Sequence, residues 1–166
     1  FASCNIDSIG IAIDKFNKLE NVIGYNNNLS LIPNSFCGLK KLKQLNLDAN
    51  KINEIPNCLV DFDKLEELFC ANNRISRIPN DIGKLSNLRE IQLNGNKIKK
   101  LPTSFYDLKN LTYCHLSDNM IKDIDERILE MEKLETLNLR NNPLNEDSKI
   151  LLGKLKEIRP DMKLKF

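Results

Sequence analysis

The chain has 166 residues and a formal net charge of +2, with 25 Lys or Arg residues against 23 Asp or Glu residues. This length is ordinary for one domain, and so small a net charge does not by itself indicate a nucleic-acid partner. Aromatic residues make up 6% of the chain, tryptophan is absent, and no apolar run has the length of a transmembrane helix.

A period of 23 residues organises most of the chain. Leucine recurs at the first position of each unit, asparagine recurs at the ninth, and proline occupies the fifteenth position of four units. The leucines are Leu19, Leu42, Leu65, Leu88, Leu111 and Leu134, and the asparagines are Asn27, Asn50, Asn73, Asn96, Asn119 and Asn142. A fixed period in this range predicts similar units stacked into a solenoid, not a globular enzyme fold.

Residues 1–18, at the start of the chain, fit the 23-residue repeat only in part. Phe1 falls on the sixth position of a unit and Cys4 on the ninth. The terminal unit of a solenoid needs a polar cap because it exposes an apolar face, and no cap is visible before Phe1. We expect residues 1–18 to be a partial, truncated repeat and the chain to be a piece of a longer protein.

Each full unit predicts a short strand, a turn and an irregular return. In one unit, Ile91 and Leu93 alternate with polar residues, as in a strand with one buried face. The asparagine at position 9 carries an acceptor and donors, so a stacked column of asparagines can satisfy the turn that leaves the strand. Pro102, at position 15, fixes φ and lacks an N–H, which favours short turns or 3₁₀ segments over long helices.

The repeat pattern ends near residue 144. Asp125 replaces proline in the last full unit, and residues 125–133 are expected to be helical. In residues 145–166, acidic residues precede apolar residues at helical spacing, which predicts a helix that Pro160 ends. This segment is expected to cap the solenoid; the alternative is an amphipathic helix from another domain. A last strand is predicted from the alternation of Met162, Leu164 and Phe166.

The unit resembles a known repeat. Its pattern, L-x-x-L-x-L-x-x-N-x-I-x-x-[IL]-P, is similar to that of the leucine-rich repeat family over residues 19–144, without insertion or deletion. The resemblance implies an α/β solenoid, a curved horseshoe with a parallel β-sheet on its concave face and short turns or 3₁₀ segments on its convex face. Residues 19–144 then hold six repeats, the last one incomplete.

The resemblance also implies a function, the binding of a protein on the concave face. The 23-residue unit with Ile-Pro resembles intracellular members such as signalling scaffolds of the Ras pathway, so we expect an interaction module in intracellular signalling or scaffolding. Two alternatives stay open: a regulatory segment of a larger kinase, phosphatase or cyclase, and a secreted recognition protein. No residue role transfers from the family, since the concave faces of its members differ.

The residues expected to bind the partner point away from the core at positions 3, 5 and 7 of the strands. Phe69 is central because an exposed aromatic ringed by polar side chains is typical of a binding hot spot. The full predicted set is Phe69, Tyr113, His115, Ile23, Tyr25, Asn46, Asp48, Glu67, Glu90, Gln92 and Arg140. Gly24 occupies an inward position, so either the core has a hole there or the strand bulges and turns Ile23 or Tyr25 inward.

Charge separates two surfaces of the solenoid. The concave columns carry a formal charge of −3 from Asp48, Glu67, Glu90 and Asp118 against Arg140, which disfavours a phosphate backbone there. The loops after the asparagines are basic, with Lys51, Arg74, Arg77, Lys97, Lys99 and Lys100. This basic flank could meet an acidic partner or lipid head groups, or be a solvated edge.

The cysteines and the single histidine do not predict a catalytic or metal site. Five cysteines without paired spacing are expected to be free thiols in a reducing compartment, which indicates a cytoplasmic protein. His115, Ser117 and Asp118 invite a catalytic interpretation, but His115 is the only histidine and lies on an open sheet. Cys114 and His115 point to opposite faces and cannot share a metal. We therefore expect no enzyme activity, no cofactor, no metal and no nucleic-acid partner, and a monomer.

Overall fold

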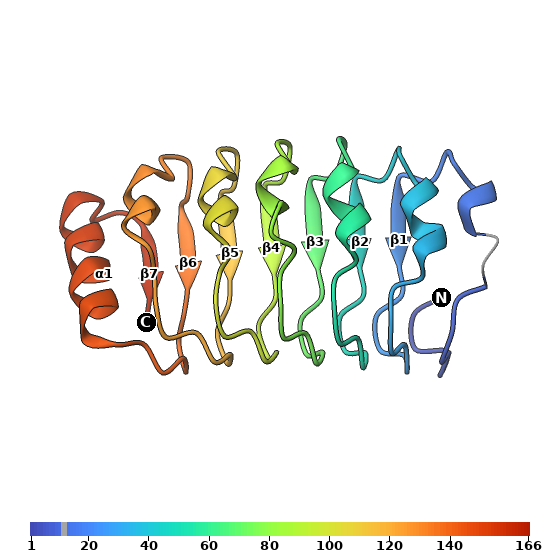
Figure 1. Ribbon diagram of the computed structural model, residues 1–166, viewed down its shortest axis with the longest axis horizontal. Coiled ribbons are helices and arrows are strands. Elements are labelled where there is room, and N and C mark those ends of the chain that lie inside the picture. The colour runs from blue at the N-terminus through green and yellow to red at the C-terminus, as the bar shows by residue number, and fades with distance from the viewer. Residues whose placement is uncertain (11–12) are drawn as a thin grey trace.

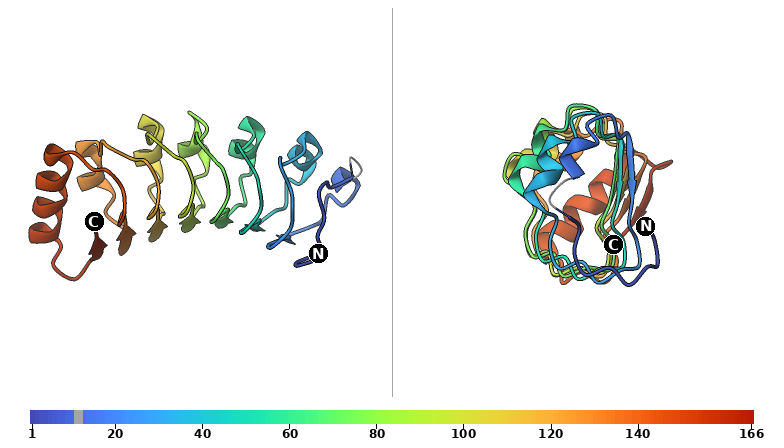
Figure 2. Two further views of the ribbon diagram at one scale, coloured as in Figure 1. Left: turned by 90° about the horizontal axis from the view of Figure 1, so that it is seen from below. Right: turned by 90° about the vertical axis from the view of Figure 1, so that its right-hand side faces the viewer.

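The computed structural model describes residues 1–10 and 13–166, and over these ranges the chain winds into a row of similar coils stacked side by side (Figure 1). Each coil contributes one short strand to a single parallel sheet, in which the strands lie in chain order. The strands are β1 Asn21–Ile23, β2 Gln44–Asn46, β3 Glu67–Phe69, β4 Glu90–Gln92, β5 Tyr113–His115, β6 Thr136–Asn138 and β7 Lys163–Lys165. Figure 2 shows the sheet along the inner side of a shallow curve and the helical turns along the outer side.

The strands pair without any slip in register. Glu67 of β3 lies opposite Glu90 of β4, and Glu90 lies opposite Tyr113 of β5. Residues that share a repeat position therefore form straight columns across the sheet, about 4.8 Å apart from strand to strand. This register is what the uninterrupted 23-residue period requires.

The outer side is built from 3₁₀ turns, as the prolines predict. They span Ile13–Lys15, Asn34–Gly38, Asn57–Asp61, Ile82–Lys84, Thr103–Asp107 and Glu126–Glu130. Pro102, immediately before the fifth turn, is extended, with φ of −66° and ψ of 152°. The prediction of a helix over residues 125–133 is wrong: Asp125 takes over the place of proline, and its carboxylate accepts a hydrogen bond from Arg127 N at 3.0 Å.

The asparagine column bonds adjacent coils together. Asn73 Nδ2 donates to the carbonyl oxygens of Leu47, Cys70 and Ala71, at 2.9, 3.2 and 3.1 Å. Its Oδ1 accepts from Ile52 N of the preceding coil at 2.9 Å. The same arrangement recurs at Asn50, Asn96, Asn119 and Asn142. A side chain with both donors and an acceptor thus satisfies backbone groups of two coils at once.

The end of the chain closes the stack with α1, Glu146–Ile158, followed by β7. Asn145 caps the helix, since its Oδ1 accepts from Ser148 N at 2.9 Å. Leu152 and Leu155 are buried against the last repeat, and β7 pairs with β6. The predicted helix and final strand are both present. The division of the chain into residues 1–18, 19–144 and 145–166 stays a prediction.

The expectation that all five cysteines are free thiols is wrong. Cys37 and Cys58 form a disulfide between two consecutive turns of the convex side, with Cα atoms 5.5 Å apart. Cys4 is free and exposed, whereas Cys70 and Cys114 are free and buried in the core, where burial raises their thiol pKa values. The repeat pattern does not predict this pairing, because the two cysteines are separated by 21 positions and not by the repeat length of 23.

Candidate protein-binding face

The concave sheet holds most of the predicted binding residues as an open surface. Ile23 and Tyr25 are each 44% exposed. Phe69 is half-buried, less open than expected, because it stands between Asn46 and Gln92 of the flanking strands. Aromatic and aliphatic side chains on this face therefore remain accessible from one side.

The structure gathers these side chains into separate groups. Ile23 ends β1 and Tyr25 follows it, two strands from Phe69, which corresponds to about 10 Å. Ala71, at position 7 of the unit that contains Phe69, is buried, with 4% of its surface exposed. Tyr113 and His115 form an edge-to-face pair with ring centroids 6.4 Å apart. Phe69 thus lies between these two groups, and within the described residues it forms no aromatic pair with either.

Gly24 neither leaves a hole nor causes a bulge. The strand before it stays regular, and Gly24 N donates to Asn46 O at 2.7 Å. A Cβ atom at Gly24 would lie 2.3 Å from the ring of Phe1, so that ring occupies the space that a leucine fills in other coils. Ile23 and Tyr25 consequently keep their outward direction.

The acidic side chains of the face are held by neighbours. Gln44 Nε2 donates to Glu67, and Gln92 Nε2 donates to Glu90 Oε1 at 2.7 Å. Asp48 Oδ1 accepts from Ala71 N at 2.6 Å. Burial raises the pKa of Asp48, and the Ala71 hydrogen bond opposes this rise. The carboxylates are therefore fixed in position on the open sheet.

A chain of hydrogen-bonded polar side chains connects β5 with β6 on this face. Asn138 Nδ2 donates to His115 Nε2 at 2.7 Å, which requires that nitrogen to be unprotonated. Ser117 Oγ lies 3.1 Å from the same nitrogen but donates its own proton to Asp118 Oδ2 at 2.6 Å. Burial lowers the pKa of His115; the charge of Asp118 opposes this, and that of Lys165 adds to it.

The hydrogen-bonded series His115, Ser117 and Asp118 has the wrong order for a serine nucleophile. In a catalytic triad the histidine stands between the carboxylate and the hydroxyl and removes the hydroxyl proton. Here Ser117 stands between His115 and Asp118, and its proton points to the carboxylate. The hydroxyl is thus not activated by the imidazole, and the arrangement instead orders the surface around Tyr113.

Two residues complete this description. Asn138, outside the predicted set, fixes the ring of His115; the 23-residue offset between the two residues would have placed them side by side. Arg140, which is in the set, is exposed, and within the described residues its guanidinium has no ion pair. With Lys163 and Lys165, which β7 places beside Thr136 and Asn138, it makes this end of the sheet basic, whereas the carboxylates Asp48, Glu67 and Glu90 lie on β2 to β4 and in the loop after β2.

The family of the chain follows from its repeats. The leucine-rich repeat family model matches residues 17–75, 63–121 and 86–144, which together span most of the sequence. The chain belongs to the leucine-rich repeat family, whose fold serves as a protein-interaction module. No curated protein sequence gives a match to the chain.

Solved structures share the same solenoid. A leucine-rich repeat protein of Leptospira interrogans has a TM-score of 0.90 and 27% identity, covering 98% of this chain and 41% of that protein. A plant peptide hormone receptor, solved in complex with RGF2, has a TM-score of 0.77 and 28% identity over 82% of this chain and 23% of the receptor. An internalin of Listeria monocytogenes is 22% identical, with a TM-score of 0.81, and the match covers 92% of this chain and 43% of the internalin. At this identity the internalin shows the fold alone. The chain spans less than half of each of these proteins.

Helices in the described part of the chain are too short or too polar to cross a membrane.

Proposed function

We propose that the concave sheet binds a protein partner, with Phe69 at the centre of the contact. The observation that carries this proposal is the open row of apolar and aromatic side chains on a face that the described residues leave uncovered. Exposed aromatics ringed by polar groups are the usual anchors of protein interfaces. The plant receptor with the same fold was solved in complex with RGF2, which supports the same use of the solenoid here.

The face offers a partner three kinds of contact. Ile23 and Tyr25 provide apolar area at one end, and Phe69 provides an aromatic anchor near the middle. Tyr113 adds a second aromatic anchor whose neighbour, His115, is held by hydrogen bonds. Because Ile23, Phe69 and Tyr113 sit on strands and Tyr25 directly follows one, a partner meets a surface whose geometry is already fixed.

Capture of partners from a lysate of the source cells tests the proposal. We expect the wild-type chain to retain a protein that a Phe69→Ser/Tyr113→Ser variant loses. Ile150→Ser/Ile158→Ser is the matched control, because it also removes two apolar side chains, both exposed on α1. Equal retention by the wild type and by the Phe69→Ser/Tyr113→Ser variant would place the binding surface elsewhere.

The cellular setting is a second part of the proposal. The resemblance of the 23-residue unit favours intracellular signalling or scaffolding in the cytoplasm. The Cys37–Cys58 disulfide favours the alternative of a recognition protein in an oxidising compartment, where such bonds persist. Alkylation of the chain from source cells, denatured without reductant, separates the two: five labelled cysteines support the first setting, and three support the second.

A further inference from the structure

The second charged surface of the molecule is the basic flank, formed by Lys51, Arg74, Arg77, Lys97, Lys99 and Lys100. These residues lie in the loops that follow β2, β3 and β4, at the edge of the solenoid where the strands end (Figure 1). All six side chains are exposed, and within the described residues none of them forms an ion pair. The flank thus carries six positive charges, none of which is held in an ion pair within the described residues.

The flank continues into a groove between two consecutive coils. The groove has a volume of about 560 Å³, and its lining includes Arg77, Lys99 and Lys100 with the hydroxyl residues Ser76, Thr103 and Ser104. No acidic residue lines it. The equivalent groove one coil earlier has about 450 Å³ but is lined by Glu54 and Asp81 as well as Arg77. The basic character is therefore particular to one groove and is not a general property of the repeat.

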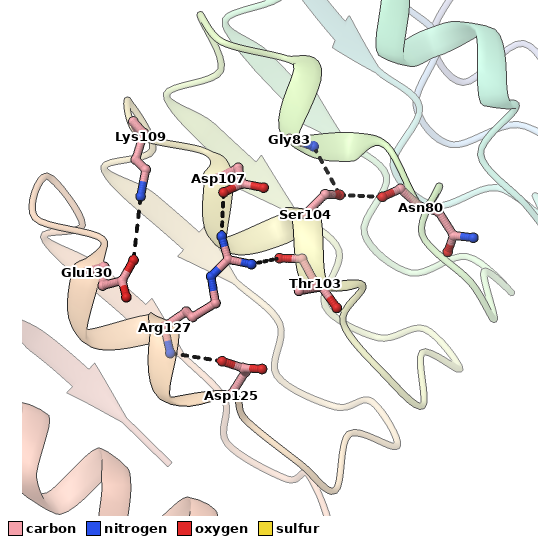
Figure 3. A network of polar contacts seen from close by, with 9 residues as sticks. All are labelled: Asn80, Gly83, Thr103, Ser104, Asp107, Lys109, Asp125, Arg127 and Glu130. Atoms are coloured by element: carbon pink, nitrogen blue, oxygen red, sulfur yellow. Dashed lines mark hydrogen bonds and ion pairs between the residues drawn. The ribbon is translucent and has the colours of Figure 1, made fainter.

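Acidic residues of the nearby convex side are already engaged (Figure 3). Asp107 bonds the guanidinium of Arg127, and Arg127 Nη1 also donates to Thr103 O at 2.9 Å. Glu130 lies 4.0 Å from Lys109, and Asp81 lies 2.8 Å from Lys84. These carboxylates have partners of their own, and within the described residues none of them forms an ion pair with Arg77, Lys99 or Lys100.

One wall of the groove is fixed by hydrogen bonds. Ser104 Oγ donates to Asn80 O and accepts from Gly83 N at 3.4 Å, which ties two coils together beside the groove (Figure 3). The side chains of Arg77, Lys99 and Lys100 project from two consecutive coils at its rim. A ligand that enters therefore meets a preformed recess with three exposed cations around it.

We propose that this groove and the basic flank bind an acidic protein segment, rich in Asp or Glu, at a site separate from the concave sheet. Like charges from adjacent coils repel one another, and carboxylates from such a segment would offset that repulsion. The recess favours an extended chain, whose side chains can enter it, over a flat lipid surface. The proposal does not rest on the function of the concave face, since the two surfaces carry opposite charge.

Fluorescence anisotropy of a labelled oligoglutamate peptide tests the site. The test variant is Arg77→Ser/Lys99→Ser/Lys100→Ser. The control is Lys18→Ser/Lys41→Ser/Lys64→Ser, which removes the same charge from exposed lysines in the loops that lead into β1, β2 and β3, at the opposite edge. We expect wild type and control to bind with similar affinity, and the test variant to bind about tenfold or more weakly. Added salt should weaken wild-type binding.

Several results would overturn the proposal. An equal loss in both triple variants would mean that net charge, not the groove, attracts the peptide. Absence of wild-type binding at low salt would remove the site. Sedimentation of the chain with anionic phospholipid vesicles, together with failure to bind the peptide, would assign the flank to a membrane. The Phe69→Ser/Tyr113→Ser variant should bind the peptide as wild type does, so the two proposals fail independently. Thermal unfolding of each variant confirms that it is folded.

Discussion

At the scale of single residues, the asparagine column supplies buried side-chain hydrogen bonds that connect adjacent coils. Asn73 makes four hydrogen bonds to backbone groups of two coils, and its side chain is buried. Replacing it with alanine leaves an N–H and carbonyl oxygens without partners in a dry environment. We predict that Asn73→Ala lowers the free energy of unfolding by about 1–3 kcal/mol. Urea denaturation measures this change.

The control for that prediction is Asn53→Ala, which removes an exposed asparagine from the preceding coil. Its free energy of unfolding should remain within about 0.5 kcal/mol of wild type. If Asn73→Ala were as stable as Asn53→Ala, the bonding role assigned to the column would be wrong.

His115 gives a residue-scale prediction about pH. Its pKa in the folded chain is lowered from 6.5, chiefly by burial, so below that pH the unfolded chain binds a proton more readily than the folded one. Stability should therefore fall as the pH drops from about 7 to 5, in the range where histidine titrates. Asp118 also has a lowered pKa, through hydrogen bonds from Ser117 and Asn141, but the stability that its carboxylate contributes is lost only as the pH falls below 3.8.

Thermal unfolding across this pH range provides the measurement. His115→Gln removes the only histidine and keeps an acceptor for Asn138, so its midpoint should depend less on pH than that of wild type. Equal slopes for the two proteins would show that other groups control the acid response.

At the scale of elements, the turn after each strand uses a left-handed residue at position 8. Asn26, Ala49, Asn72, Asp118 and Asn141 have φ between 51° and 57°, and Gly95 has φ of 66°. Asn, Asp and Gly adopt this conformation most readily, whereas an alanine there is strained. Five of the six coils thus place a suitable residue at the turn, and Ala49 is the exception.

This exception predicts a stabilising substitution. Ala49→Gly removes the strain of a Cβ atom at φ of 51° and should raise the free energy of unfolding by about 1 kcal/mol. Ala71→Gly is the comparison, because Ala71 is buried and is not left-handed; it should lower stability by about 0.5–1 kcal/mol. Chemical denaturation of both variants measures the two changes. Opposite signs support the account of the turn, and a loss at Ala49 contradicts it.

The Cys37–Cys58 disulfide links two consecutive convex turns across 21 residues of sequence. Closing a loop of this size restricts the unfolded chain, so Cys37→Ser/Cys58→Ser should lower the free energy of unfolding by about 2–4 kcal/mol. Urea denaturation of the oxidised chain, with and without the substitutions, gives the value. Cys4→Ser, which changes an exposed free thiol, should have no effect. A double variant as stable as wild type would show that the bond contributes nothing.

At the scale of the whole molecule, the fold could be predicted from sequence because each repeated column has one physical task. The leucines fill the core, the asparagines bond the turns, and the prolines prevent long helices on the convex side. The uninterrupted spacing also fixed the strand register, and with it the columns that contain Phe69 and Tyr113. The outward direction of these two residues followed from strand alternation alone.

Features between coils could not be predicted in the same way. The ring of Phe1 fills the space at Gly24, which depends on side-chain packing across two units and not on the pattern of either. Cys37 and Cys58 stand at different repeat positions, and the sequence period does not describe how convex turns approach each other. The half-burial of Phe69 likewise depends on the side chains of its flanking strands.

The central claim is that the concave sheet binds protein. It is tested most directly by measuring the dissociation constant between a captured partner and purified variants of the chain. The account predicts about tenfold or weaker binding for Phe69→Ser/Tyr113→Ser and unchanged binding for Ile150→Ser/Ile158→Ser. Unfolding curves must show that both variants are folded. In Phe69→Ser/Tyr113→Ser, the free energy of unfolding should fall by about 1 kcal/mol for each half-buried side chain removed. Unchanged affinity of the folded Phe69→Ser/Tyr113→Ser variant would contradict the claim.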